Sequence, residues 1–188
     1  MNNFFVEETN IEGLKVIIPF YAEDDRGFYI KTYERDIFKS LGMDIDIQEL
    51  CGSISKKGVL RGLHFQTKYA QSKLVRCAYG EIYDVAVDLR PESKSFGKWY
   101  GIFLSHINKK MLFIPSGFAH GILAMTEDAV LSYHSSEKYI KDYDSGIIWN
   151  DTDLNITWPI NKVNGNIILS EKDKKLQSFK EYCSKMIG

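Results

Sequence analysis

The chain has 188 residues, of which 44% are hydrophobic and 13% aromatic, a composition that suits one folded domain over residues 1–188 and excludes a disordered protein. Its 24 lysines and arginines nearly balance its 25 aspartates and glutamates, and no basic block stands out along the chain. We therefore expect neither nucleic acid nor a membrane as a partner.

Cellular location is predicted from the N-terminal segment and the cysteines. The segment MNNFFVEETNIEGLK carries acidic residues early and lacks an apolar stretch after a basic start, so we expect no signal peptide. No apolar run reaches the length of a membrane span. The three cysteines, Cys51, Cys77 and Cys183, are too widely spaced for a disulfide framework or a zinc pattern, and we interpret them as small buried side chains. These features predict a cytoplasmic protein.

The first predicted element is a helix in the segment 32–42, TYERDIFKSLG. Ile37, Phe38 and Leu41 form one apolar stripe at helical spacing. Gly42 follows the stripe and suits a C-terminal cap, so we expect the helix to end there.

The middle of the chain alternates apolar and polar residues over short segments that end at turn residues, which is typical of β-strands. In YGEIYDVAVDLRP, residues 79–91, the side chains of Tyr83, Val85 and Val87 fall on one face and that of Asp84 on the other. The same pattern recurs in SKLVRCAYGE, WYGIFLS, KKMLFIPSG, GILAM and AVLSYHS. Many strands, short turns and little helix predict a mostly β fold, either a sandwich or a barrel.

The last predicted element is an amphipathic helix in the segment 170–188, SEKDKKLQSFKEYCSKMIG. Its apolar face would carry Leu176, Phe179, Cys183 and Met186 and would dock on the sheet. Asp173 lies three residues after a serine at the start of this segment, which also indicates a capping box.

Two of the four histidines lie in segments that suit chemistry. His120 follows a Pro-Ser-Gly turn in PSGFAHG, a pattern that resembles the second motif of the cupins, double-stranded β-helix barrels that often hold a metal. The first cupin motif needs an H-x-H pair and a glutamate, whereas RGLHFQ, residues 61–66, supplies His64 and a glutamine. A transition-metal site needs about three or four compatible ligands, so we expect no bound metal and no cofactor.

A longer series of motifs follows in order along the chain: DDRGFY, RGLHFQ, SKLVRC, GEIYDVAVDLR, FGKW, IPSGFAHG, Tyr133 and LSEKD. With this series the chain resembles the dTDP-4-dehydrorhamnose 3,5-epimerases, from DDRGFY near residue 25 to LSEKD near residue 173. The resemblance implies a double-stranded β-helix (cupin or jelly-roll) barrel with short flanking helices, assembled as a homodimer. The implied substrate is a nucleotide-diphosphate-linked 4-keto-6-deoxy sugar.

The reaction of this family inverts carbons 3 and 5 of the sugar, which both flank a ketone and therefore carry removable hydrogens. A base removes a proton from one face, an enolate forms, and an acid returns a proton to the other face. By resemblance, His64 is the base, Tyr133 the acid and Asp173 the carboxylate that orients the histidine. Lys73 and Arg61 would bring positive charge to the enolate oxygen.

These residues also have purely structural interpretations. By itself, His64 suits a core histidine with a satisfied hydrogen bond. If the strand through RGLHFQ is regular, Arg61 and His64 point to opposite faces, so we expect Gly62 to bend or bulge it. Asp84 would face the interior, where a buried aspartate needs a partner, either His64 or His120.

The diphosphate of the implied substrate requires cationic groups around its oxygens. Tyr139 is similar to the aromatic residue of the family that stacks on the nucleobase, and Asp144 matches an acidic contact near it. The residues that the resemblance assigns to substrate binding are Arg26, Arg61, Lys73, His120, Tyr139, Asp144 and Lys172.

The chain departs from the family pattern at two places. Lys31 stands where a glutamate usually contacts the nucleotide. The usual Gln-Asp-Asn-His run is replaced by Gln48, Glu49, Leu50, Cys51 and Gly52. We keep Lys31, Gln48 and Glu49 among the candidate substrate-binding residues, and we expect both departures to alter nucleotide preference rather than the acid–base chemistry.

Other functions stay open at this point. One alternative is an epimerase that acts on another nucleotide-linked 4-keto sugar, or that inverts carbon 3 alone. A second is a cupin that binds sugar without turnover, although such a module needs neither a base nor an acid. A third is a metal-dependent cupin isomerase or oxygenase.

Overall fold

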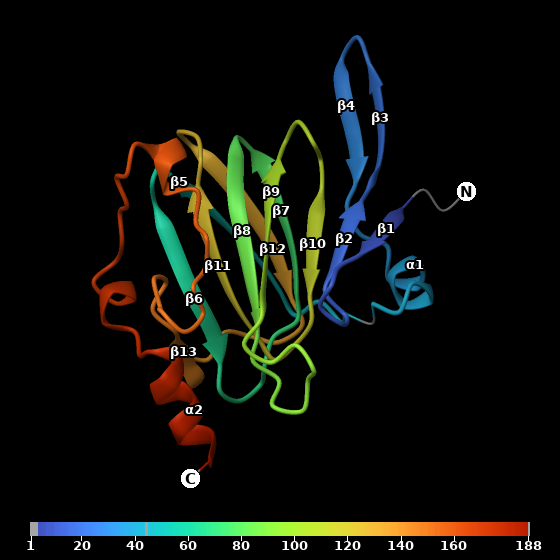
Figure 1. Cartoon of the computed structure of the whole chain (residues 1–188). Coiled ribbons are helices and arrows are strands. Elements are labelled where there is room, and N and C mark those ends of the chain that lie inside the picture. The colour runs from blue at the N-terminus through green and yellow to red at the C-terminus, as the bar shows by residue number, and fades with distance from the viewer. Residues whose placement is uncertain (1–3, 44, 188) are drawn as a thin grey trace.

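The strands of the protein form two larger sheets that face each other around an interior (Figure 1). The computed structural model describes residues 4–43 and 45–187, and within them the strands form a six-stranded sheet, a five-stranded sheet and a two-stranded hairpin. The six-stranded sheet has the order β1 (Phe5–Glu8), β2 (Lys15–Ile18), β10 (Met111–Ile114), β7 (Lys73–Tyr79), β12 (Ala129–Ser135) and β5 (Glu49–Ser55). The five-stranded sheet has the order β13 (Asp144–Gly146), β6 (Leu60–Gln66), β11 (Phe118–Ala124), β8 (Glu81–Asp88) and β9 (Trp99–Ser105).

The remaining elements flank this barrel. The hairpin of β3 (Phe20–Asp24) and β4 (Gly27–Lys31) projects from one side of it (Figure 1). The helices are α1 (Arg35–Ser40) and α2 (Phe179–Ile187), with short 3₁₀ turns η1 (Lys141–Tyr143), η2 (Ile160–Val163) and η3 (Asp173–Lys175). The predicted mostly β barrel of the cupin type, with short flanking helices, is confirmed.

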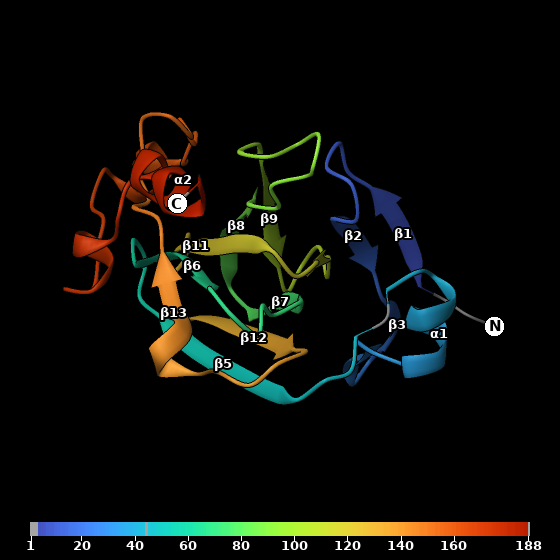
Figure 2. The ribbon, with the colours of Figure 1, turned by 90° about the horizontal axis from the view of Figure 1, so that it is seen from below.

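Alternation along each strand separates the barrel interior from the two outer surfaces. On β8, Ile82 and Ala86 pack into the interior, whereas Val85 and Val87 pack outward against the C-terminal segment, as the sequence pattern predicts. On the other sheet, Leu74 faces outward into a third core that α1 covers. Viewed from below, α1 lies beside the first strands of the six-stranded sheet, and α2 lies beside the five-stranded sheet (Figure 2).

The first predicted helix is present but shorter than the segment 32–42. It begins at Arg35 and ends at Ser40, and it buries Ile37 and Phe38. Gly42 takes the positive φ of 75° that suits the residue after a helix, so the predicted stop is correct.

The C-terminal helix was predicted to include the whole segment from residue 170, and this is wrong. The chain makes the 3₁₀ turn η3, then turns extended at Leu176, and α2 begins only at Phe179. The capping box lies at Ser178 and Glu181: the Ser178 hydroxyl accepts from the Glu181 N–H at 3.2 Å, and the Glu181 carboxylate accepts from the Ser178 N–H at 2.7 Å. The later capping box therefore sets the start of this helix.

The cysteines do not all behave as buried hydrophobic side chains. Cys77 is buried in the barrel interior, but Cys51 and Cys183 are partly exposed, so the prediction is correct only for Cys77. In the part of the chain that the structure describes, no helix is long and apolar enough to cross a membrane.

A buried carboxylate organises the turn after β8. Asp88 is 0% exposed and accepts hydrogen bonds from the Arg90 guanidinium and from the hydroxyls of Ser93 and Ser95. Burial raises the pKa of Asp88, but the hydrogen bonds from Arg90 and the two serines outweigh burial and bring this pKa to about 2.

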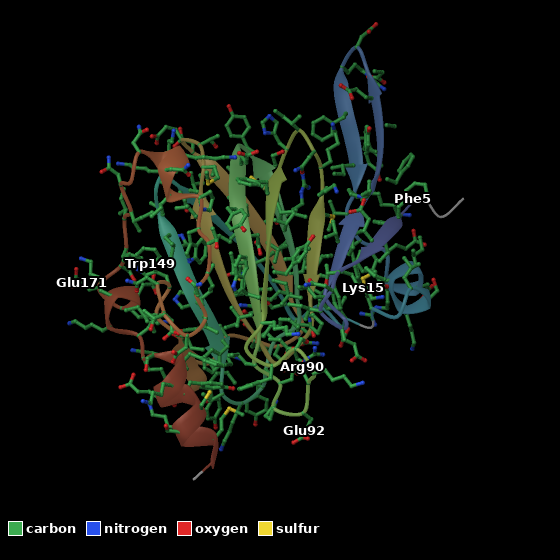
Figure 3. All side chains as sticks on the ribbon, viewed as in Figure 1. Phe5, Lys15, Arg90, Glu92, Trp149 and Glu171 are labelled. Carbon is green, nitrogen blue, oxygen red and sulfur yellow. The ribbon has the colours of Figure 1, made fainter. Side chains whose placement is uncertain are left out.

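The same turn supports the neighbouring strand. The Arg90 guanidinium lies 4.8 Å from the ring centroid of Phe118, the first residue of β11. Figure 3 shows Arg90 and Glu92 at the lower end of the barrel, where β8 ends opposite the start of β11. This contact holds the start of the strand that carries His120.

Replacing Asp88 by asparagine should lower the free energy of unfolding at pH 7 by about 2 kcal/mol, because the folded-state pKa lies below the ordinary 3.8 at about 2. A depressed carboxyl pKa stabilises the fold above the unfolded-state pKa and loses this effect as the pH falls through the folded-state pKa. The gap between parent and variant should therefore narrow between about pH 4 and pH 2. Urea unfolding at several pH values measures the gap.

Asp24→Asn is the matched control, because Asp24 pairs with Arg26 at the same spacing but is exposed. Its unfolding curve should match that of the parent. An Asp88→Asn gap that is as wide at pH 3 as at pH 7 would contradict the prediction.

Candidate active site

Two adjoining cavities of about 280 Å³ and 380 Å³ lie between the two larger sheets. They share His64, Lys73, Tyr133 and Lys172 in their walls, and together we name them the central cavity. The candidate residues that line the central cavity are Glu49, Arg61, His64, Lys73, His120, Tyr133, Tyr139, Asp144, Lys172 and Asp173.

Gly62 allows two candidate side chains of β6, three positions apart, to face this cavity. It has a φ of 125°, and a Cβ there would lie 2.5 Å from the Gly121 Cα on the neighbouring strand, so no larger residue fits. The pairing of β6 with β11 shifts register at this place. Arg61 and His64 therefore both line the central cavity, as we expected from the glycine.

His64 forms a hydrogen-bonded pair with a buried carboxylate from a distant segment. Its Nε2 lies 2.5 Å from Oδ1 of Asp173, which is only 3% exposed. Burial raises the pKa of Asp173, but the hydrogen bond and the charge of His64 lower it by more than burial raises it. The net shift of this pKa is therefore downward. An Nε2 that donates to a carboxylate leaves Nδ1 as the ring nitrogen that can accept a proton.

Asp173 makes only one half of the capping box that its sequence context suggested, and it does so at the short turn η3 instead of at the start of α2. Its backbone N–H donates to the Ser170 hydroxyl at 3.0 Å, while its carboxylate contacts His64. The structural and the functional interpretation of this residue are therefore compatible, since they use different atoms.

Tyr133 enters the cavity from the sheet opposite His64. It lies on β12 of the six-stranded sheet, whereas His64 lies on β6 of the five-stranded sheet. Burial first, and then the Cys51 and Glu49 side chains, raise the pKa of Tyr133 to about 12, against a smaller opposing effect of Arg61. The phenol therefore stays protonated over the whole physiological range.

Lys73 supplies positive charge beside this phenol. Its Nζ lies 5.9 Å from the ring centroid of Tyr133. Burial lowers the pKa of Lys73 to about 8, although the charges of Asp84, Asp144 and Cys51 oppose this shift. The ammonium is thus largely charged at pH 7 and loses its charge within the next pH unit or two.

A second histidine–carboxylate pair lies next to the first. Nε2 of His120 lies 3.0 Å and 2.9 Å from the two carboxylate oxygens of Asp84, which is 0% exposed. Asp84 therefore pairs with His120, one of the two histidines that the sequence left open. His120 and His64 face each other directly in the register of β11 and β6.

At the mouth of the cavity, Asp144 joins an exposed tyrosine to a lysine. The Tyr139 hydroxyl donates to Oδ2 of Asp144 at 2.9 Å, and the Lys172 ammonium forms an ion pair with the same oxygen. Tyr139 is 55% exposed, so its ring offers an open aromatic face beside the cavity.

The structure does not bring Arg26, Lys31 or Gln48 into the central cavity of their own chain. Arg26 and Lys31 lie on the projecting hairpin, where they pair with Asp24 and Glu34. The Gln48 side chain is exposed, and its amide donates to Asp46 at 3.0 Å.

Sequence reasoning kept Glu49 as a candidate but missed Cys51 and Ser53 on the same face of β5. Successive strand residues point to opposite sides, so Glu49, Cys51 and Ser53 line the cavity, whereas Leu50 and Ile54 are each 67% exposed. The alternation of polar residues with Leu50 and Ile54 in ELCGSIS was the signal that could have identified them.

The donor set for a metal is sparse. Within residues 4–43 and 45–187, no group of three or more histidine, cysteine, aspartate or glutamate side chains could hold a metal ion. His64 and His120 each direct Nε2 at a carboxylate.

Comparison with known proteins identifies the family. A family model described as dTDP-4-dehydrorhamnose 3,5-epimerase matches residues 8–181. The dTDP-4-dehydrorhamnose 3,5-epimerase of Methanothermobacter thermautotrophicus is 42% identical over 181 residues, which are 96% of this chain and 97% of that protein. The Escherichia coli protein of the same name is 44% identical over 178 residues, 94% of this chain and 95% of that protein.

A solved structure agrees with these relatives. The dTDP-6-deoxy-D-glucose-3,5-epimerase of Legionella pneumophila, in complex with dTDP-4-keto-L-rhamnose, matches with a TM-score of 0.93 and 34% identity. The match covers 98% of this chain and 97% of that chain. The chain therefore belongs to the dTDP-4-dehydrorhamnose 3,5-epimerase family.

Proposed function

We propose that this protein inverts carbons 3 and 5 of dTDP-4-dehydro-6-deoxyglucose and forms dTDP-4-dehydrorhamnose by acid–base chemistry. Its membership of the epimerase family supports the reaction, and the Legionella relative that binds dTDP-4-keto-L-rhamnose supports the nucleotide and the sugar. Neither a metal nor a redox cofactor is part of the proposal, because the ketone already activates both carbons.

The observation that carries the proposal is the placement of a base and an acid on facing sheets. Epimerisation removes a proton from one face of a carbon and returns one to the other face. His64, oriented by Asp173, comes from the five-stranded sheet, and Tyr133 comes from the six-stranded sheet. A sugar ring held between the sheets would thus have a base on one side and an acid on the other.

The cavity also offers charge for the enolate oxygen that forms when a proton leaves. Arg61 lies three residues before His64 on β6, and the Lys73 Nζ lies 5.9 Å from the ring centroid of Tyr133. Preorganised donors of this kind stabilise developing negative charge without reorganisation. We assign Lys73 and Arg61 to the ketone oxygen and neighbouring groups, with His120 as a further donor.

The nucleotide would occupy the mouth of the cavity. Tyr139 presents an exposed ring on which a base can stack, and Lys172 adds a cation beside Asp144. We therefore assign Tyr139, Asp144 and Lys172 to the nucleotide, together with Glu49 on the cavity wall.

We further propose that the protein works as a homodimer in which the hairpin reaches the partner's site. Arg26 lies on this hairpin with its side chain 89% exposed, outside the central cavity of its own chain, although the family resemblance assigns it to substrate binding. The outer face of the six-stranded sheet exposes Leu50 and Ile54, and the buried Nδ1 of His134 on this face has no hydrogen-bond partner among the described residues. A second copy over this face would cover the apolar side chains.

The acid–base assignment predicts two different defects. His64→Ala should abolish deuterium incorporation from heavy water at both carbons, because no proton leaves. Tyr133→Phe should still permit exchange with retained configuration, while inversion falls about a hundredfold or more. Proton NMR of the dTDP-linked 4-keto sugar in deuterated water measures exchange and inversion together. Exchange at the parent rate in His64→Ala would show that another residue is the base.

The Lys73 pKa predicts a basic limb in the pH profile. Lys73 is charged below its pKa of about 8 and neutral above it, so kcat/KM should fall as the pH rises through this value. Lys73→Arg is the matched variant, because its guanidinium stays charged and should remove this limb even if its rate is lower. A parent profile that is flat from pH 7 to pH 9.5, or an unchanged limb in Lys73→Arg, would argue against the assignment.

Complementation tests the shared site. His64→Ala and Arg26→Ala should each be impaired alone, whereas a mixture refolded or exchanged together should recover up to about a quarter of the parental sites, because half of the dimers are hybrids with one intact site. Turnover at low substrate concentration measures the recovery. No recovery, or sedimentation as a 21.7 kDa species, would rule out a site built from both copies.

A further inference from the structure

We infer that Cys51 is a positioning residue for the acid: its thiol accepts a hydrogen bond from the Tyr133 hydroxyl and fixes the orientation of the phenol at the cavity wall. The inference rests on the proposed role of Tyr133 as the acid. It concerns a residue at which the chain departs from the family's sequence pattern.

The strand register places the two residues together. Tyr133 of β12 is the direct cross-strand partner of Cys51 of β5 in the antiparallel pairing. Residues directly opposite each other point to the same side of the sheet, with their Cβ atoms about 5 Å apart. Both side chains line the central cavity, and the charge and hydrogen-bonding capacity of Cys51 contribute, after burial, to the raised pKa of Tyr133.

The surroundings of Cys51 distinguish it from the other cysteines. Cys77 is enclosed in the interior core and Cys183 lies on α2, whereas Cys51 is half-buried in the cavity wall with Lys73 nearby. Cys51 acts to raise the pKa values of both Lys73 and Tyr133. The thiol thus lies opposite the acid in the strand register and shares the cavity wall with the cation that we assign to the enolate oxygen.

A thiol suits this task because sulfur is a weak hydrogen-bond acceptor. It can orient the phenol O–H in the absence of substrate and still release the proton to carbon. A carboxylate at the same place would hold the proton more strongly, because hydrogen bonds to charged acceptors are about twice as strong. Burial first, and then Cys51, raise the pKa of Tyr133, which keeps the proton on the phenol until the enolate takes it.

The test compares Cys51→Ala with Cys51→Ser, whose hydroxyl can still accept the bond. In Cys51→Ala, kcat for inversion should fall about two- to threefold, the value of a hydrogen bond at the weak end of the usual range, with KM unchanged. The ratio of exchange with retention to inversion should rise in the alanine variant, which a loss of packing alone would not cause. Cys51→Ser should stay close to the parent in both respects. Cys183→Ala, outside the cavity, is the control and should behave as the parent.

A double-mutant cycle decides whether Cys51 acts through Tyr133. If it does, Cys51→Ala should cause no further loss of inversion in the Tyr133→Phe background. Losses that multiply, or a raised KM with unchanged kcat in Cys51→Ala, would overturn the inference and indicate an independent contact with substrate. Normal inversion in Cys51→Ala alongside a defective Tyr133→Phe would overturn this inference alone. Normal inversion in Tyr133→Phe would instead contradict the assignment of Tyr133 as the acid.

Discussion

The hydrogen bond between His64 and Asp173 joins residues that are 109 positions apart, and the geometry of the site depends on it. A buried carboxylate is costly unless it is paired, so the contact holds the segment at η3 against β6. The same contact determines which imidazole nitrogen remains available toward the cavity. The C-terminal segment is therefore part of the candidate active site as well as the cover of the five-stranded sheet.

Besides this pair, two carboxylates in or beside the central cavity have close partners, and one lysine, Lys73, has no ion-pair partner among the described residues. His120 and Asp84 satisfy each other, and Asp144 is bound by Tyr139 and Lys172. Among the described residues no carboxylate forms an ion pair with Lys73, and burial lowers its pKa to about 8 against the opposing charges of Asp84 and Asp144. A cation in this state can respond to new negative charge, which is the electrostatic requirement of an enolate mechanism.

The two sheets divide the work of the proposed reaction. Because β6 and β12 belong to opposite sheets, their inward side chains approach a bound ring from two sides. Each strand has a close neighbour at this level: Gly121 of β11 lies against Gly62 of β6, and Cys51 of β5 lies opposite Tyr133 of β12. The projecting hairpin carries Arg26 and exposed aromatic rings, and on the proposed assembly it would supply the anion-binding groups that one chain lacks.

The sequence by itself determined the strands, the inward face of β8, the stop of α1 at Gly42 and the need for a bend at Gly62, since each depends on residues that are adjacent in the chain. Only the tertiary structure decided that Asp84 pairs with His120, because their contact depends on the register between β8 and β11. It also decided that Glu49 faces the cavity while Gln48 does not, and that Cys51 lies opposite Tyr133. Periodicity along a strand is a local property of the backbone, whereas the pairing of strands distant in sequence is set by how the whole barrel closes.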